Sequence, residues 1–251
     1  MSDVKLKTKN TFEKFLNSEL LEDGNQNKIP EGYKVVKSYP LNPPFSYATI
    51  LQDTETSGYL YYVDEVQLNQ EEEIIFQKLY DLIEHSLDLE RRSEKNSGIN
   101  SYLNKVLEEN KKIFQSYTLA SLEKVKYYLK KEIVGFGLID PIMHDPNIED
   151  ISCSGIKTPI YVWHREFDSV PTNVEFEDEK LNNFITRIVF RAGKHISSAY
   201  PISDLALEGN HRISVLYQKE ITPKGTSFTI RKFREDPCQR LGVITIHVRG
   251  L

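Results

Sequence analysis

The chain has 251 residues, of which 39% are hydrophobic and 27% are charged, a composition typical of a globular protein with one or two domains. The net charge of −5 argues against a general nucleic-acid-binding protein, so no nucleic-acid partner is expected. No apolar run is long enough to span a bilayer and no signal peptide opens the chain. Cys153 and Cys238 show neither metal-ligand spacing nor a disulfide framework, which predicts a reducing, cytoplasmic location and no metal site.

Residues 1–30 are polar and weakly patterned, and we expect them to form a flexible tail. The alternative is a short amphipathic helix over Thr11–Leu21 that orders when it docks on a partner.

Residues 31–136 are predicted to form a small hairpin followed by a helical bundle. Tyr47–Leu51 and Tyr59–Val63 are rich in β-formers and flank a turn-like segment, which is typical of a hairpin. Three amphipathic patterns then predict three helices: from Asn69 to a break at Ser93–Gly98, over Asn100–Gln115, and over Leu119–Val134.

Residues 137–237 are predicted to form a mixed α/β unit that begins at the glycines around Phe136. Short strands are expected at Glu149–Ser154 and Pro159–His164, a helix at Glu179–Ala192 and a hairpin turn at Ala206–Asn210. The predicted fold class is therefore α+β. It consists of an N-terminal helical bundle with a small β-hairpin, followed by a compact, PAS-like α/β domain in which helices flank a mixed sheet.

Two polar residues of this unit have a structural interpretation. Asp145 precedes a proline and an asparagine, so it is expected to cap a helix or to form a turn rather than to belong to a catalytic carboxylate pair. His164 lies at a strand end beside a charged pair, where a turn-anchoring role is favoured over a reactive one.

A basic hairpin closes the unit. Arg212–Tyr217 and Ser227–Arg231 alternate apolar and polar residues, with Gly225 at the turn between them. Arg212, Arg231, Lys232 and Arg234 gather at one end of this hairpin. Guanidinium groups on a rigid strand pair suit phosphate, because each can hold two oxygens at once. The alternative is a solvated basic hairpin without a ligand.

Several motifs resemble, in order, the region before the motor domain of the secretion-ATPase superfamily. These are the hexameric ATPases of type II secretion, type IV pili, type IV secretion and the archaeal pilus and archaellum systems, and the archaeal branch is the most similar. The resemblance covers about Gly135 to Pro237. Its motifs are Gly137–Ile151, Tyr161–Phe167, Val170–Asn173, Arg191–Lys194 and Gly225–Pro237. Asp168 departs from the pattern, since related sequences usually have glycine there.

The resemblance implies a role at a nucleotide site. In the family this α/β unit is the second N-terminal domain and packs over the ATP site of the motor. Arg212 and Arg231 would then act as catalytic arginine fingers, and Arg231, Lys232 and Arg234 would contact the nucleotide, which is ATP with Mg²⁺ in the presence of the motor domain. The implied partners are a motor domain of the same or a neighbouring subunit, further copies in a hexamer, and a membrane platform protein at the inner face of the membrane.

The sequence has no Gly-x-x-x-x-Gly-Lys-Ser/Thr phosphate loop, so the chain alone is predicted to be inactive and to form at most a weak dimer. Residues 238–251 form a divergent tail in which Leu241–Val248 is typical of a strand, whereas the family continues with a helix. Either the sequence is cut or the protein is naturally shortened. A non-enzymatic adaptor that docks on a secretion platform or on a full-length ATPase is the main alternative, and a small-ligand sensor is a further one.

Overall fold

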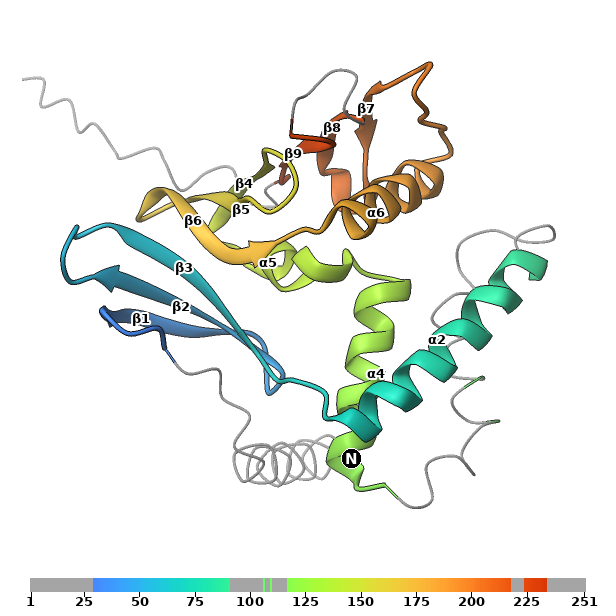
Figure 1. The fold of residues 1–251 in the computed structure, drawn as a ribbon, viewed down its shortest axis with the longest axis horizontal. Helices are drawn as coiled ribbons and strands as arrows, with labels where there is room; N and C mark the ends of the chain where they lie inside the picture. The colour runs from blue at the N-terminus through green and yellow to red at the C-terminus, as the bar shows by residue number, and fades with distance from the viewer. Residues whose placement is uncertain (1–28, 91–105, 107–108, 110–116, 218–223, 234–251) are drawn as a thin grey trace, which may run out of the picture.

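The structure is a computed structural model that describes residues 29–90, 106, 109, 117–217 and 224–233 (Figure 1). The possible helix at Thr11–Leu21, the tail after Pro237 and, apart from Val106 and Glu109, the helix predicted at Asn100–Gln115 lie outside these residues. No helix within the described part of the chain is long and apolar enough to cross a membrane.

A mixed sheet of nine strands runs through the described residues in the order β1-β2-β3-β6-β5-β4-β9-β8-β7. The pairing of β3 with β6 is parallel and every other pairing is antiparallel. The strands are β1 (Tyr33–Asn42), β2 (Ser46–Asp53), β3 (Tyr59–Glu65), β4 (Ile148–Cys153), β5 (Pro159–His164), β6 (Asp168–Glu175), β7 (Ile202–Ala206), β8 (Arg212–Leu216) and β9 (Ser227–Arg231).

The predicted fold class is wrong. Instead of a small hairpin beside a helical bundle, the N-terminal part contributes a three-stranded meander that extends the large sheet (Figure 1). Where β3 meets β6, two hydrogen bonds join the meander to the α/β unit: the Val63 N–H donates to Asn173 Oδ1 at 2.8 Å, and Asn173 Nδ2 donates to the Val63 carbonyl at 3.1 Å. Alternation of apolar residues predicts a strand but does not say which other strand will pair with it. The joining of the meander to the α/β unit in one sheet therefore could not be inferred.

The prediction of β1 failed for a local reason. This strand carries Pro40 and the exposed pair Val35 and Val36, and none of its residues is buried. Only Tyr39 and Leu41 of this strand are partly buried hydrophobic residues packed against the core, so the period-two signature of a half-buried strand is short. The expected strands were therefore limited to Tyr47–Leu51 and Tyr59–Val63.

Helices α2 (Gln70–Glu90) and α4 (Leu119–Ile133) pack beside the sheet and agree with the helices expected from Asn69 and over Leu119–Val134. Asn69 and Glu72 form a reciprocal capping box at the start of α2, since each side chain accepts the other residue's backbone N–H at 2.9 Å. Glu72 also pairs with Lys124 of α4 at 2.9 Å, and both side chains are buried. This ion pair links α2 and α4 within the apolar cluster that the two helices share.

Helix α6 (Asp178–Arg191) covers one face of the C-terminal strands. Its buried residues are Leu181, Phe184, Ile185, Ile188 and Val189. They share a core with the inward residues of the strands beside them, which include Ile151, Val162, Ile213 and Ile230. The residues that alternate with these on β5, β8 and β9 are exposed or half-buried. The same alternation therefore buries one face under α6 and leaves polar and aromatic side chains on the other.

Short helical turns η2 (Gly137–Ile139) and α5 (Asp140–His144) connect α4 to β4. Gly135 is required at this junction, because a Cβ atom there would lie 2.2 Å from Asp140 Oδ1. That carboxylate accepts the Phe136 N–H at 2.8 Å and so fixes the chain direction. A second special position is Asp168, whose φ of 55° lies in the left-handed region that favours glycine.

Candidate functional site: an arginine row on the open sheet face

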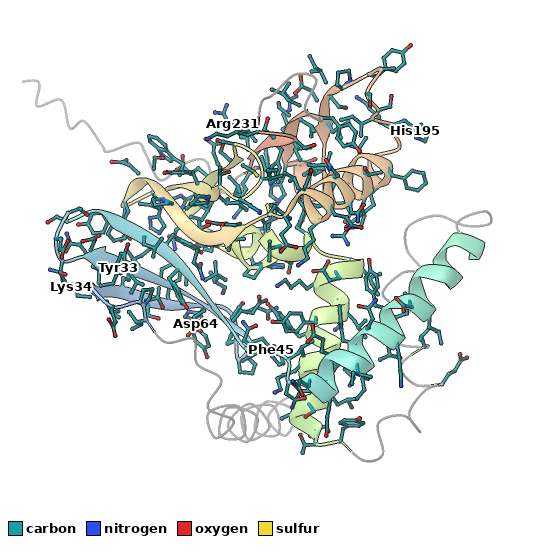
Figure 2. The ribbon with its side chains drawn as sticks, in the orientation of Figure 1. Tyr33, Lys34, Phe45, Asp64, His195 and Arg231 are labelled. Carbon is teal, nitrogen blue, oxygen red and sulfur yellow. The ribbon has the colours of Figure 1, made fainter. Side chains whose placement is uncertain are left out.

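Arg212 and Arg231 lie directly opposite each other where β8 and β9 pair. Directly opposed residues of an antiparallel pair point to the same face of the sheet, so the two guanidinium groups share one face. The pairing of these strands is confirmed, and it places the arginines together without a flexible loop between them. Figure 2 shows Arg231 in the C-terminal part of the sheet, away from α2 and α4.

The two arginines differ in their partners. Arg231 Nε donates to Asp150 Oδ1 at 3.2 Å, while the Arg231 side chain remains 79% exposed. Its two terminal NH₂ groups make no hydrogen bond to described residues. Arg212 is exposed and likewise forms no hydrogen bond or ion pair within the described part of the chain. Both guanidinium groups therefore have donors directed to solvent, which is the condition for binding an oxyanion.

Arg212 and Arg231 form what we call the arginine row, and the line of side chains that it begins continues across two further strands. Asp150 on β4 pairs with Arg231 on one side and with Trp163 of β5 on the other. Trp163, Asp150, Arg231 and Arg212 thus form one transverse line on the open face. Tyr161, two residues before Trp163, lies on the same face, and both rings are more than two-fifths exposed. An aromatic surface and a basic surface therefore meet on this face.

Lys232 is the next residue after Arg231 and points the other way. Its Nζ donates to the backbone carbonyl of Asp145, and its backbone N–H donates to the Glu149 carbonyl at 2.8 Å. Burial lowers the pKa of Lys232 to about 8, against the opposing effect of the nearby Asp145 charge. Lys232 thus anchors the end of β9 rather than extending the arginine row. Arg234, also predicted at the nucleotide site, lies outside the described residues.

A buried polar network lies behind this anchor. The Asp145 carboxylate is fully buried, and its Oδ2 accepts hydrogen bonds from Tyr39 at 2.6 Å and from Tyr61 at 2.8 Å. Its Oδ1 accepts the Asn147 N–H at 2.8 Å, so the expected turn role is confirmed. The sequence did not reveal the tyrosine partners, because they come from β1 and β3, 106 and 84 residues earlier in the chain.

His164 completes this network. Its Nδ1 accepts the Glu166 N–H at 3.0 Å, which confirms its role as a turn anchor and assigns the ring proton to Nε2. Nε2 lies 3.1 Å from the Tyr39 hydroxyl oxygen, which accepts this proton while donating its own to Asp145. Burial lowers the pKa of His164, so the imidazole is kept neutral. Lys232 donates to the Asp145 carbonyl, so this network of hydrogen bonds links the N-terminal meander to the end of β9, next to Arg231.

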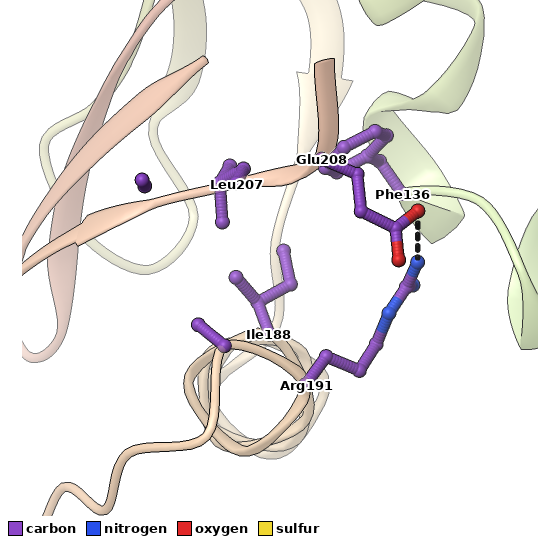
Figure 3. A pocket seen from close by; sticks show the side chains of 7 residues that line it. Phe136, Ile188, Arg191, Leu207 and Glu208 are labelled. Carbon is purple, nitrogen blue, oxygen red and sulfur yellow. Dashed lines mark ion pairs between the residues drawn. The ribbon is translucent and has the colours of Figure 1, made fainter. Parts of the chain in front are cut away.

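A small cavity lies on the other side of the sheet, between α6 and the β7–β8 connection (Figure 3). Its volume is about 110 Å³, and its walls include Phe136, Ile188 and Leu207. Arg191 crosses its rim, 3.6 Å from Glu208, and donates to the Gly135 carbonyl at 2.8 Å. The cavity is smaller than the usual range for small-molecule sites, and the sheet separates it from the arginine row. No group of three or more His, Cys, Asp or Glu residues in the described ranges is placed to hold a metal ion.

The sequence is similar to three uncharacterized proteins of Methanocaldococcus jannaschii, while no protein-family model matches it. It is 35% identical to MJ1288 over 167 residues, which are 64% of this chain and 65% of that protein. It is 40% identical to MJ0900 over 116 residues, or 46% of this chain and 21% of that protein. MJ0781 is 27% identical over 108 residues, or 43% and 15% of the two chains. The chain therefore spans less than two thirds of each relative.

Part of the fold overlaps with solved structures, among them a secretion-system ATPase. The VirB11 ATPase from the Brucella suis type IV secretion system, in complex with sulphate, aligns with a TM-score of 0.31 and 19% identity. The alignment covers 36% of this chain and 27% of that protein. An overlap this small carries no conclusion about this chain.

Proposed function

We propose that this chain is the N-terminal regulatory and partner-docking part of a hexameric ATPase of the secretion or type IV pilus-assembly class. Arg212 and Arg231 would contribute to a nucleotide site that a motor domain of the same or a neighbouring subunit completes. The single observation that carries the proposal is the direct opposition of these two arginines on an open sheet face. The ordered motifs from Gly135 to Pro237 supply the family context.

The chemistry follows from rigidity and charge. As a phosphoryl group leaves ATP, negative charge spreads over the oxygens of the transferring and departing phosphates. Guanidinium groups held on paired strands lie ready to offset that charge without reorganisation during the reaction. Asp150 holds Arg231 through Nε and leaves its NH₂ groups for phosphate. Lys232 anchors the end of β9, so it would set the position of Arg231 rather than touch the nucleotide.

Reconstitution in trans tests this proposal. The chain is mixed with the purified motor domain of a secretion ATPase from the same organism, and turnover is measured with ATP and Mg²⁺. We expect the chain to raise turnover, and the double variant Arg212→Ala/Arg231→Ala to lose about a hundredfold or more of that gain. Lys180→Ala is a control for the loss of one positive charge away from the site, since Lys180 is an exposed residue of α6 on the covered side of the sheet, and it is compared with each single arginine variant. Equal stimulation by parent and double variant would contradict the proposal.

The second candidate is a non-enzymatic adaptor, which the absence of a phosphate loop within these 251 residues favours. An adaptor would bind the full-length ATPase or the membrane platform with the same affinity whether or not the arginines are present. In the same experiment, binding to the motor domain without any change in turnover would favour the adaptor over the nucleotide-facing role.

A further inference from the structure

The open face presents four different side chains in a fixed order. From β5 to β8 the transverse line reads Trp163, Asp150, Arg231 and Arg212, with one residue from each of four adjacent strands. Neighbouring strands are about 4.8 Å apart, so the line is roughly 14 Å long. The order of chemical groups along it is an aromatic ring, a carboxylate and two guanidinium groups.

The aromatic end has an exposed flat ring. The Trp163 side chain is 43% exposed although its strand neighbours Val162 and His164 are buried. Tyr161 is exposed on the same face of β5. Rings held this way on a strand are stacking surfaces for nucleobases, as in single-stranded nucleic-acid-binding sheets, where one base stacked on one aromatic ring contributes about 1–3 kcal/mol.

The middle of the line has an unused acceptor. Arg231 Nε occupies only Oδ1 of Asp150, and no described residue donates to Oδ2. The Asp150 side chain is one-third exposed, so its second oxygen is accessible to a hydroxyl group. In dinucleotide-binding folds, carboxylates accept hydrogen bonds from ribose hydroxyls.

We infer that ATP lies along this line, with its adenine ring against Trp163, its ribose at Asp150 and its phosphates at Arg231 and Arg212. The inference rests on the proposed function for its phosphate end and adds a base subsite and a ribose subsite to it. Charge complementarity fixes the direction, because the triphosphate avoids Asp150 and meets the two guanidinium groups. An extended adenine nucleotide has a length comparable to the line of side chains.

The test uses a property of this chain: Trp163 is its single tryptophan. Tryptophan fluorescence, excited where adenine does not absorb, is followed while the full chain is titrated with ATP at millimolar concentration. We expect saturable quenching by ATP, and no quenching by inorganic tripolyphosphate, which nevertheless competes with ATP for the arginines. Calorimetric titration of Trp163→Ala should show ATP affinity reduced by roughly tenfold and tripolyphosphate affinity unchanged. Trp163→Phe should retain most of the affinity.

Phe190→Ala is the matched control, since Phe190 is an exposed aromatic residue of α6 on the covered side of the sheet. Its ATP affinity should equal that of the parent. Equal affinities for ATP and tripolyphosphate without quenching would overturn the base subsite and leave the phosphate role of the arginines standing. Quenching by ATP, combined with reconstituted turnover that does not depend on the arginines, would support the base subsite and refute the proposed function. The absence of any saturable ATP binding would overturn this inference.

Discussion

Removing one hydroxyl from the buried network, by Tyr61→Phe, should destabilise the whole sheet. Tyr61 is fully buried and donates to the buried Asp145 carboxylate at 2.8 Å, so water cannot replace the lost hydrogen bond. A hydrogen bond to a charged group contributes about 1.5–3 kcal/mol to the free energy of unfolding. For a chain of this size, each kcal/mol shifts the melting temperature by about 2–4 °C, which gives an expected loss of roughly 3–12 °C.

The assay is urea or thermal unfolding followed by Trp163 fluorescence. Trp163 lies on β5 while Tyr61 lies on β3, so the reporter and the substitution are in different parts of the sheet. The control is Tyr62→Phe, since Tyr62 is the next residue on the same strand and is only half-buried; its effect should be within about 0.5 kcal/mol. If Tyr61→Phe is no more damaging than Tyr62→Phe, or if Trp163 does not report the loss, the account of a buried network joining one cooperative sheet is refuted.

Three further outcomes follow from other contacts. Lys124→Met should cost about 3–5 kcal/mol in urea unfolding, because it leaves the buried Glu72 carboxylate without its partner, and adding Glu72→Gln should recover part of that loss. Gly135→Ala should cost about 1–3 kcal/mol, because the new methyl group would overlap Asp140; a melting temperature equal to that of the parent would contradict this. The free energy of unfolding should fall as the pH is lowered through about 6.5, because His164 has a folded-state pKa below its unfolded value and the unfolded chain binds more protons. A flat profile between pH 7.5 and 5 would refute the last point, and His164→Gln should flatten the parent's slope.

The sequence allowed good predictions wherever a single periodicity covered a whole element. Helix α4, helix α6 and strand β5 have the positions that their apolar spacing predicts. The opposition of Arg212 and Arg231 could also be predicted, because both flank buried residues on consecutive strands. These features depend on the spacing of apolar residues within one element or between neighbouring strands, which can be read from the sequence.

Features that depend on long-range pairing could not be predicted. Strand β6 carries Pro171 and Asn173, which are poor strand formers, yet Asn173 bridges the two parts of the sheet. Asp145 was expected to form a turn, and it does so. Its tyrosine partners could not be predicted, because they lie 84 and 106 residues earlier in the chain. Trp163 gave no signal as part of the open face, because its significance depends on the strands that pair beside it.

Steady-state kinetics of the reconstituted ATPase test most directly whether Arg212 and Arg231 act on the phosphoryl group as it leaves. An interaction made mainly in the transition state lowers kcat and kcat/KM together. Arg212→Ala and Arg231→Ala should each lower kcat by about a hundredfold or more, while the KM for ATP changes far less. If both variants retain kcat within about threefold of the parent, which corresponds to about 0.65 kcal/mol in the activation barrier, the arginines have no catalytic role and the hairpin is a scaffold.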